Sequence, residues 1–316
     1  MHQPNQIDFF ELNLQLPTSE LIWEFESAEH LAFAEIDFLI NPRRTRGSDF
    51  QMRWAQGRWS EEIAIRALNQ TAQFGVLPYG PSIIEPEDPA EREQFYEKMR
   101  PIFQEGKRPD LLLYDKLTYE WARDEVERHL GTVEQMAAAS SVHLRDVVAK
   151  AKAALEIENS LWVTEKMPGF GKPFSRYKRG KNKGRLKPAG IVPNIWIKQE
   201  DISPLQRWEA EHKIAVHIVQ IFYDRGYFIK FNDVLDLLEA GELGMETESY
   251  TNPSGRASSP KQVVRVPYIL CKEFGTVSGP TLEPRAIVDK NGKVMTYVTF
   301  SGGEIQLSSA VFKEWG

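Results

Sequence analysis

This sequence has almost no cysteine, and its histidines form no metal-binding pattern. Its 316 residues include one cysteine, Cys271, which excludes an intramolecular disulfide framework and any zinc site built from several thiolates. We expect this thiol to be buried and inert. The six histidines, at positions 2, 30, 129, 143, 212 and 217, form neither an HExxH motif nor another metal-ligand spacing. A His-based zinc enzyme or His-metal nuclease is therefore not indicated.

Long apolar runs and nucleotide-binding fingerprints are missing too. No segment approaches the roughly 20 apolar residues that a membrane-spanning helix needs. The opening MHQPNQIDFFELNLQ lacks the charged segment and apolar run of a signal peptide, so we expect a soluble cytoplasmic protein without membrane contact. GxxxxGK[ST] does not occur, and the GFG at 169–171 does not complete a dinucleotide-binding motif.

An excess of positive charge is also missing. The chain has 39 Lys and Arg against 45 Asp and Glu, a formal net charge of −6. Proteins that coat nucleic acid without sequence preference carry a global excess of basic residues, so this balance argues against that class. A specific nucleic-acid enzyme needs positive charge only where phosphates pass, and it gathers carboxylates where it holds metal.

The apolar pattern predicts an α/β fold with a mixed central sheet flanked by helices. The hydrophobic content of 41% suffices for one large core. Apolar residues at helical spacing predict a helical N-terminal part, and Ser60 is a candidate N-cap for a later helix. Further helices are expected at 91–103, broken at Pro101 and Gly106, at 117–130 and at 141–152, and buried strands at 108–115 and 153–162.

The segment 191–223 predicts a strand, a helix that begins at Ser203 and Pro204, and a second strand. Such a connection most often joins parallel strands of one sheet by a right-handed crossover. After residue 240 the sequence turns to Gly, Ser, Pro and short β-prone pieces. We therefore expect a core over 1–240, with a helical elaboration at its N-terminus, and a β-rich C-terminal extension over 241–316 packed on that core.

Three carboxylates occur where the two buried strands are expected. Asp110 opens the first strand, and Glu156 and Glu158 follow about 46 residues later on one face of the second, opposite Leu155 and Ile157. Separately, each acid has an ordinary explanation as a turn or solvent-facing residue. Together, at the ends of buried strands, they are costly unless a metal or basic partner receives them, and Mg²⁺ prefers such oxygen ligands.

The same residues carry a resemblance to a known superfamily. RPDLLLYD followed by ALEIENSLW resembles the split motif of PD-(D/E)XK nucleases, with Pro109 and Asp110 as the PD and Glu156 as the (D/E). The succession WSEE, RPDLLLYD, EIENSLW, NIWIKQEDISPLQRWE and IVQIFYD is similar to type II restriction endonucleases over about residues 55–235. The resemblance implies a restriction-endonuclease-like fold and Mg²⁺ bound by Asp110 and Glu156.

The chain departs from the superfamily pattern at Glu158, where these nucleases usually carry Lys. Glu158 can act as general base or as a second metal ligand. Alternatively, Lys198 on the strand IWIK can restore the positive charge, although a solvated strand end is the ordinary reading of this lysine. Superfamily members often add an acid from the preceding helix; Glu62 is the candidate metal ligand and Glu61 the alternative, because either can simply favour the helix dipole.

Basic residues concentrate in GKPFSRYKRGKNKGRLK, which contains no acid. In a chain of negative net charge, such a loop suits a phosphate backbone, whereas a solvated surface loop is the alternative. The Arg-rich stretch after residue 42 is a second candidate, with reading of guanine edges as its sharpest role. The expected DNA contacts are Arg43, Arg44, Arg46, Lys172, Arg176, Lys178, Arg179, Lys181, Lys183, Arg185 and Lys187.

The resemblance implies a type II restriction endonuclease that cuts both DNA strands at a short palindromic site and leaves 5′-phosphate ends. A palindromic target calls for a two-fold symmetric homodimer, and a cognate DNA methyltransferase would protect the host site. A non-catalytic sequence-specific DNA-binding protein and a DNA repair or structure-specific nuclease of the same fold remain the alternatives. A glycosidase would also pair carboxylates, but it leaves the basic loop unexplained.

Overall fold

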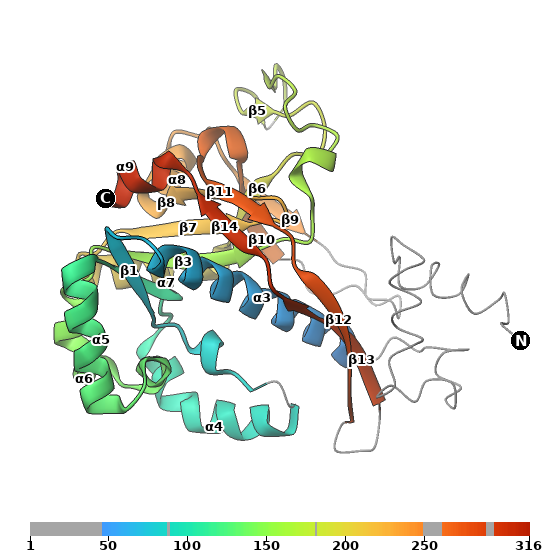
Figure 1. The fold of residues 1–316 in the computed structure, drawn as a ribbon. Helices are drawn as coiled ribbons and strands as arrows, with labels where there is room; N and C mark the ends of the chain where they lie inside the picture. Colours follow the sequence, from blue (N-terminus) through green and yellow to red (C-terminus); the bar gives the residue numbers. More distant parts are fainter. Residues whose placement is uncertain (1–45, 87–88, 181, 249–260, 289–293) are drawn as a thin grey trace, which may run out of the picture.

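The computed structural model describes residues 46–86, 89–180, 182–248, 261–288 and 294–316. They form a mixed α/β structure around a seven-stranded sheet (Figure 1). Of the neighbouring strands in this sheet, β3 and β7 are parallel and the other pairs are antiparallel. The strand order is β1 (Phe74–Pro78), β2 (Leu111–Asp115), β3 (Ala153–Asn159), β7 (Val216–Ile221), β8 (Arg225–Lys230), β11 (Lys272–Ser278) and β14 (Glu304–Leu307). The expected α/β class with a mixed sheet is confirmed.

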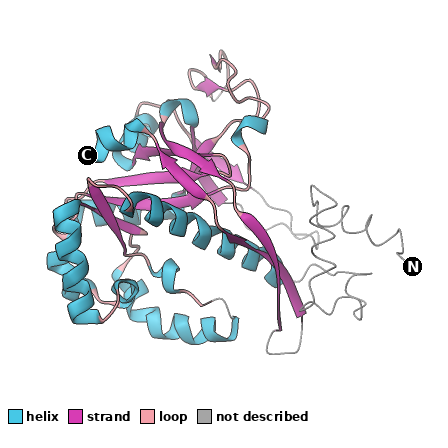
Figure 2. Cartoon of the chain, viewed as in Figure 1, coloured by secondary structure: helices cyan, strands magenta, loops and turns pink. Residues whose placement is uncertain are grey.

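Helices pack on both faces of this sheet because its strands are apolar on both faces (Figure 2). Leu111 and Leu113 point to one face and pack with Trp59 and Trp315, whereas Leu112 points to the other and packs with the opposite helices. Burial of each such leucine contributes about 1.5–3 kcal/mol. The first face carries α3 (Arg46–Asn69) and α9 (Ser309–Trp315), and the second carries α5 (Lys116–Leu130), α6 (Ser141–Val148), α7 (Gln199–His212) and α8 (Phe231–Glu239).

Residues after 241 contribute strands to more than one sheet. β11 and β14 complete the large sheet, and β10 (Lys261–Pro267) pairs with both β6 (Asn194–Lys198) and β9 (Met245–Glu248). The long hairpin of β12 (Thr281–Val288) and β13 (Val294–Ser301) lies along α3 (Figure 1). The remaining elements are α4 (Pro89–Glu105), a small hairpin of β4 (Ser175–Arg176) and β5 (Leu186–Lys187), and the short 3-10 helices η2 (Pro81–Ile84), η3 (Val133–Ala138), η4 (Thr164–Lys166) and η5 (Tyr268–Leu270).

Several expected helix ends were wrong. Ser60 does not cap a helix; it lies buried inside α3 and its hydroxyl donates to the Gly57 carbonyl at 2.7 Å. α3 already begins at Arg46, because the aromatic and basic stretch before Ser60 carries the same buried face. Pro101 lies inside α4, which continues to the residue before Gly106. The end of α5 before Gly131, which has φ +91°, is confirmed.

The expected parallel pairing between the two strands of the 191–223 segment was wrong. β6 pairs antiparallel with β10, because both edges of β7 are occupied by β3 and β8. α7 starts at Gln199, four residues before the expected N-cap, and Pro204 lies within it. The earlier start places Glu200 and Asp201 in the first turn, where carboxylates favour the helix dipole.

The C-terminal helix α9 is fixed to the sheet by one carboxylate. Glu314 pairs with Lys272, with Lys230 at 2.8 Å and with His217 at 3.4 Å. Although burial opposes ionisation, hydrogen bonds from these three groups lower the pKa of Glu314 to about 2. In the described part of the chain, none of the helices has both the length and the apolar surface required to cross a bilayer.

Candidate active site

The acids predicted from the two strand motifs meet at one edge of the large sheet. Leu111 of β2 pairs with Leu155 of β3 in antiparallel register, so Asp110 lies opposite Glu156. Asp110 Oδ2 accepts a hydrogen bond from the Ile157 backbone nitrogen at 2.7 Å. Leu155 and Ile157 are buried against α3, which leaves Glu156 on the opposite face, as the alternation in the sequence predicted.

The backbone around Asp110 is held by the segment that follows β1. The amides of Tyr79 and Gly80 donate to the Asp110 carbonyl at 2.7 and 2.9 Å. A β-carbon at Gly80 would lie 2.9 Å from both the Cα and Oδ1 of Asp110, so this close approach requires glycine. The Ser82 hydroxyl lies 3.3 Å from Asp110 Oδ1 and 3.3 Å from Glu61 Oε2.

Of the two acids on α3, Glu61 lies with the strand acids and Glu62 does not. The sequence had favoured Glu62 as the metal ligand from this helix. Glu61 is buried on the face of α3 that also carries the buried Ala64 and Leu68, at spacings of three and seven residues. Glu62 is exposed and pairs with Arg58 at 2.9 Å. The apolar spacing of α3 was the signal in the sequence that distinguishes the two.

Glu61 and Glu156 are buried and Asp110 and Glu158 are half-buried, and this loss of solvent makes ionisation of all four acids costly. It raises the pKa of Asp110 to about 6, of Glu158 to about 7 and of Glu156 to about 8. Burial, and then the negative charge of Asp110, raise the pKa of Glu61 well above its ordinary value. Buried carboxylates that repel one another are stabilised by a cation among them.

Lys107, which the sequence reasoning missed, supplies one such positive charge. Its Nζ lies 2.5 Å from Glu156 Oε1 and 3.0 Å from Asp201 Oδ1. Burial opposes the charged form, but Glu156 and Asp201 raise the pKa of Lys107 above its ordinary value. Lys107 stands three residues before Asp110, in KRPD, and Asp201 in the first turn of α7. Both positions flank motifs that the sequence had already singled out.

Asp110 and Glu156 supply oxygen ligands of the kind that a hard divalent cation prefers. Glu156 Oε2 is buried and has no hydrogen-bond partner among the described residues. Asp110 lies beside it, and carboxylate oxygens are the ligands that Mg²⁺ prefers. In the described ranges no three His, Cys, Asp or Glu side chains form a ready-made metal cage. Metal entry would therefore require the carboxylates of Glu156 and Asp110 to turn toward a common point.

Lys198 approaches the site from β6, with its side chain half-exposed. Its Nζ lies 4.0 Å from Asp201 Oδ2. The pKa of Glu158 is raised mainly by burial, and the charge of Lys198 acts in the opposite direction. Lys107 and Lys198 therefore both approach Asp201, one on each carboxylate oxygen, and Lys107 alone of the two has an ion pair with Glu156.

The basic loop forms the small β4–β5 hairpin, which projects from the body of the molecule (Figure 1). Its base contacts Glu242 through Arg176 at 3.5 Å and lies near Asn194, the first residue of β6. Lys198 is at the other end of β6, about 13 Å along the strand. The hairpin is therefore displaced from the acids along β6. Its exposed basic residues include Lys172, Arg176, Lys178, Arg179, Lys183 and Lys187, and Arg185 is half-buried.

The side chains of four predicted DNA contacts lie outside the part of the chain that the structure describes. Arg43, Arg44 and Lys181 lie outside the described residues, and the side chain of Arg46, the first residue of α3, is outside them as well.

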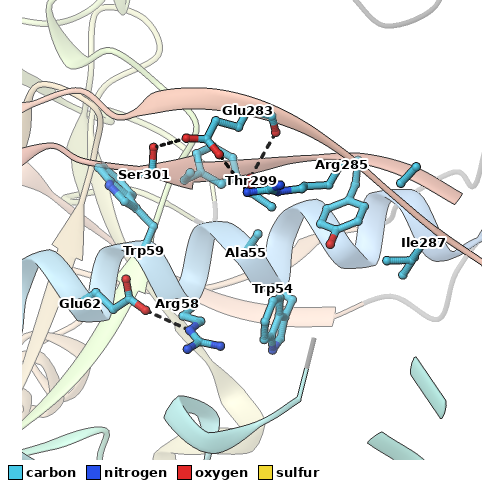
Figure 3. Close-up of a pocket in the computed structure, with 13 residues that line it drawn as sticks. Trp54, Ala55, Arg58, Trp59, Glu62, Glu283, Arg285, Ile287, Thr299 and Ser301 are labelled. Atoms are coloured by element: carbon cyan, nitrogen blue, oxygen red, sulfur yellow. Dashed lines mark hydrogen bonds and ion pairs between the residues drawn. The ribbon is translucent and has the colours of Figure 1, made fainter. Parts of the chain in front are cut away.

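A separate hollow of about 520 Å³ lies between α3 and the β12–β13 hairpin (Figure 3). Its charged groups pair with one another. Arg58 contacts Glu62 at 2.9 Å and lies 5.6 Å from the Trp54 ring centroid, and Arg285 contacts Glu283 at 3.1 Å. This hollow therefore lacks the converging acids that distinguish the edge at Asp110.

Comparison with known proteins adds no family to these observations. No family model matches the sequence, and neither a curated protein nor a solved structure matches it significantly.

Proposed function

We propose that this protein is a Mg²⁺-dependent DNA endonuclease of the PD-(D/E)XK type, specifically a type II restriction endonuclease with a restriction-endonuclease-like fold. One observation carries the proposal: Asp110, just before β2, lies opposite Glu156 of β3, and Glu156 Oε2 is buried with no hydrogen-bond partner among the described residues. A buried carboxylate oxygen without a donor is costly unless it serves a ligand or ion.

Asp110 and Glu156 would hold the metal, with Glu61 behind them on α3. When bound, Mg²⁺ would lower the pKa of the attacking water and neutralise charge on the phosphate. Lys107 is placed to contact a non-bridging phosphate oxygen or the water, since its ammonium already lies among the acids. Nucleases of this superfamily usually carry a lysine at the position of Glu158. Lys107 would take over the role of that lysine. Glu158, two residues beyond Glu156 on β3, and Lys198, at the end of β6, would assist.

The partner in this account is double-stranded DNA. The exposed lysines and arginines of the β4–β5 hairpin would contact phosphates at a distance from the cut. Two copies related by a two-fold axis would each cut one strand of a short palindromic site and leave 5′-phosphate ends. A cytoplasmic enzyme of this kind needs a DNA methyltransferase that protects the host site.

Digestion of a plasmid of known sequence tests the proposal. With Mg²⁺ we expect discrete fragments whose sequenced ends share one short motif, and with EDTA we expect intact plasmid. The Glu62→Gln variant, which removes an exposed acid one residue from Glu61, should cleave as the wild type does. Intact plasmid with wild-type protein over a range of Mg²⁺ and Mn²⁺ concentrations would contradict the proposal.

A non-catalytic DNA-binding protein is the second candidate, and one contact favours it. Lys107 already compensates Glu156 and Asp201, so this acid cluster has a structural explanation without metal. On that account the plasmid stays intact while the protein still retards DNA in a gel.

A further inference from the structure

A cavity of about 440 Å³ opens directly beside the candidate active site. Asp110, Glu156 and Lys107 line one end of it. The rest is formed by η2 with Glu85 directly after it and by α4, with Phe95, Tyr96, Ile102 and Phe103 among the lining residues. The cavity thus joins a charged floor, where a phosphate would bind, to an apolar wall.

The wall consists largely of exposed aromatic rings. Tyr96 is 45% exposed and Phe103 42% exposed, and their ring centroids are 6.0 Å apart. Phe95 lies 5.6 Å from Tyr96. Large aromatic surfaces are normally buried, so rings grouped on the wall of a cavity indicate a flat apolar ligand.

The second basic residue that lines the cavity, Arg108, already has partners. Arg108 donates to the Ala139 carbonyl at 2.8 Å and to Glu105 at 2.5 Å, and its guanidinium lies over the Tyr79 ring. Among the described lining residues, Arg108 therefore does not provide a second anion site. A ligand that suits both parts has one phosphate for the floor and one aromatic group for the wall.

We propose that this cavity takes the base of the nucleotide adjacent to the cleaved phosphate, swung out of the DNA stack. The proposal rests on the proposed nuclease function. With the phosphate held by Lys107 and by the metal that Asp110 and Glu156 would bind, the base stacks on Tyr96 and Phe103, because every base presents a flat face to an aromatic ring. Many enzymes that must reach a base inside the duplex swing that nucleotide out of the stack into a pocket.

The test uses a duplex that contains the target sequence found by plasmid digestion, with Ca²⁺ in place of Mg²⁺ to prevent cleavage. 2-Aminopurine next to the cut phosphate should gain fluorescence severalfold when wild-type protein binds, and 2-aminopurine five or more positions away should not. A mismatch at the same nucleotide should tighten binding by about tenfold, because the unpairing cost is already met.

Variants locate the base in this cavity. Phe103→Ala should abolish the gain in affinity from the mismatch, and Phe103→Leu, which keeps the apolar volume, should weaken it. Tyr96→Phe retains the ring and should keep the gain. Leu117→Ala is the control for loss of an exposed apolar side chain, since Leu117 is 81% exposed on α5. Circular dichroism confirms that each variant is folded.

Each outcome has a defined consequence. If wild-type protein cleaves DNA, but 2-aminopurine fluorescence does not rise on binding and a mismatch does not tighten binding, the base stays stacked. This proposal is then wrong while the nuclease function stands. If the signal persists in folded Phe103→Ala, the base is extruded elsewhere and the cavity assignment is wrong. If wild-type protein neither binds nor cleaves any duplex, both proposals fail together.

Discussion

The ammonium of Lys107 lies between Glu156 of β3 and Asp201 of α7, 2.5 Å from one carboxylate and 3.0 Å from the other. This lysine joins two elements that belong to different parts of the sequence. It also neutralises part of the buried negative charge at the edge of the sheet where Asp110 lies. A divalent cation entering the same cluster would compete with it for Glu156.

Lys107→Met should destabilise the metal-free protein by about 2–4 kcal/mol, because removal of one partner leaves buried carboxylates without their counter-ion. Divalent metal should restore much of the loss. Melting temperatures of both proteins with EDTA and with about 10 mM Ca²⁺ measure the loss and its recovery. Lys313→Met, an exposed lysine on α9, is the control. An equal loss of stability with and without metal would show that Lys107 does not occupy a cation site.

Glu61→Gln should have opposite effects on stability and on cleavage. Removal of one of several mutually repelling buried acids should raise the melting temperature of the metal-free protein. Cleavage should fall by about 10–100-fold, because the polar group behind the metal ligands is altered. Glu62→Gln should change neither quantity. Equal effects of the two variants would contradict the assignment of Glu61 to the site.

The β4–β5 hairpin should contact phosphates and contribute little to sequence preference. Replacement of Lys178, Arg179 and Lys183 by Ala should weaken binding to cognate and non-cognate duplexes by similar factors. Each lost phosphate contact should reduce the salt slope of log K by about one unit. Titrations at several salt concentrations measure this. An unchanged slope would mean that the hairpin lies away from DNA, and a loss confined to the cognate duplex would mean that it reads bases.

Glu314 should make folding stability sensitive to acid. Its folded-state pKa of about 2 lies below the value of about 4.3 expected in the unfolded chain. Its contribution is therefore present above pH 4.3 and is lost as pH falls toward 2. Glu314→Gln should lower the melting temperature at pH 7, and the difference from wild type should shrink between pH 4 and pH 2. A constant difference across this range would exclude Glu314 as its source.

The sequence alone predicted which acids of the strands come together. It did not predict the side chains that contact them from other elements. Side chains alternate between the two faces of a strand, which puts Glu156 on the face away from Leu155. This prediction is confirmed, since Leu155 and Ile157 pack on one face of β3 and Ala154 on the other. Lys107 lies in a short loop, and its contact with Asp201 depends on how α7 packs against the sheet. Local sequence patterns carry no information on such long-range packing.

The same limit explains the errors in the fold. The partner of β6 is β10, more than 60 residues away, and nothing near β6 in the sequence favours that pairing over β7. Ser60 has the composition of an N-cap, but the buried contacts of Trp59 and Ile63 extend α3 on both sides of it. Tertiary packing thus overrode local capping signals.

Asp110→Asn and Glu156→Gln test most directly whether these two acids form a metal-dependent nuclease site, with plasmid cleavage and gel-shift affinity measured in parallel. We expect both variants to lose cleavage by at least about a thousandfold, because loss of a metal ligand removes several kcal/mol of transition-state stabilisation. Binding should stay within about threefold of wild type, since phosphate contacts remain. Cleavage above a few per cent of the wild-type rate in both variants would contradict a metal site built from these two acids.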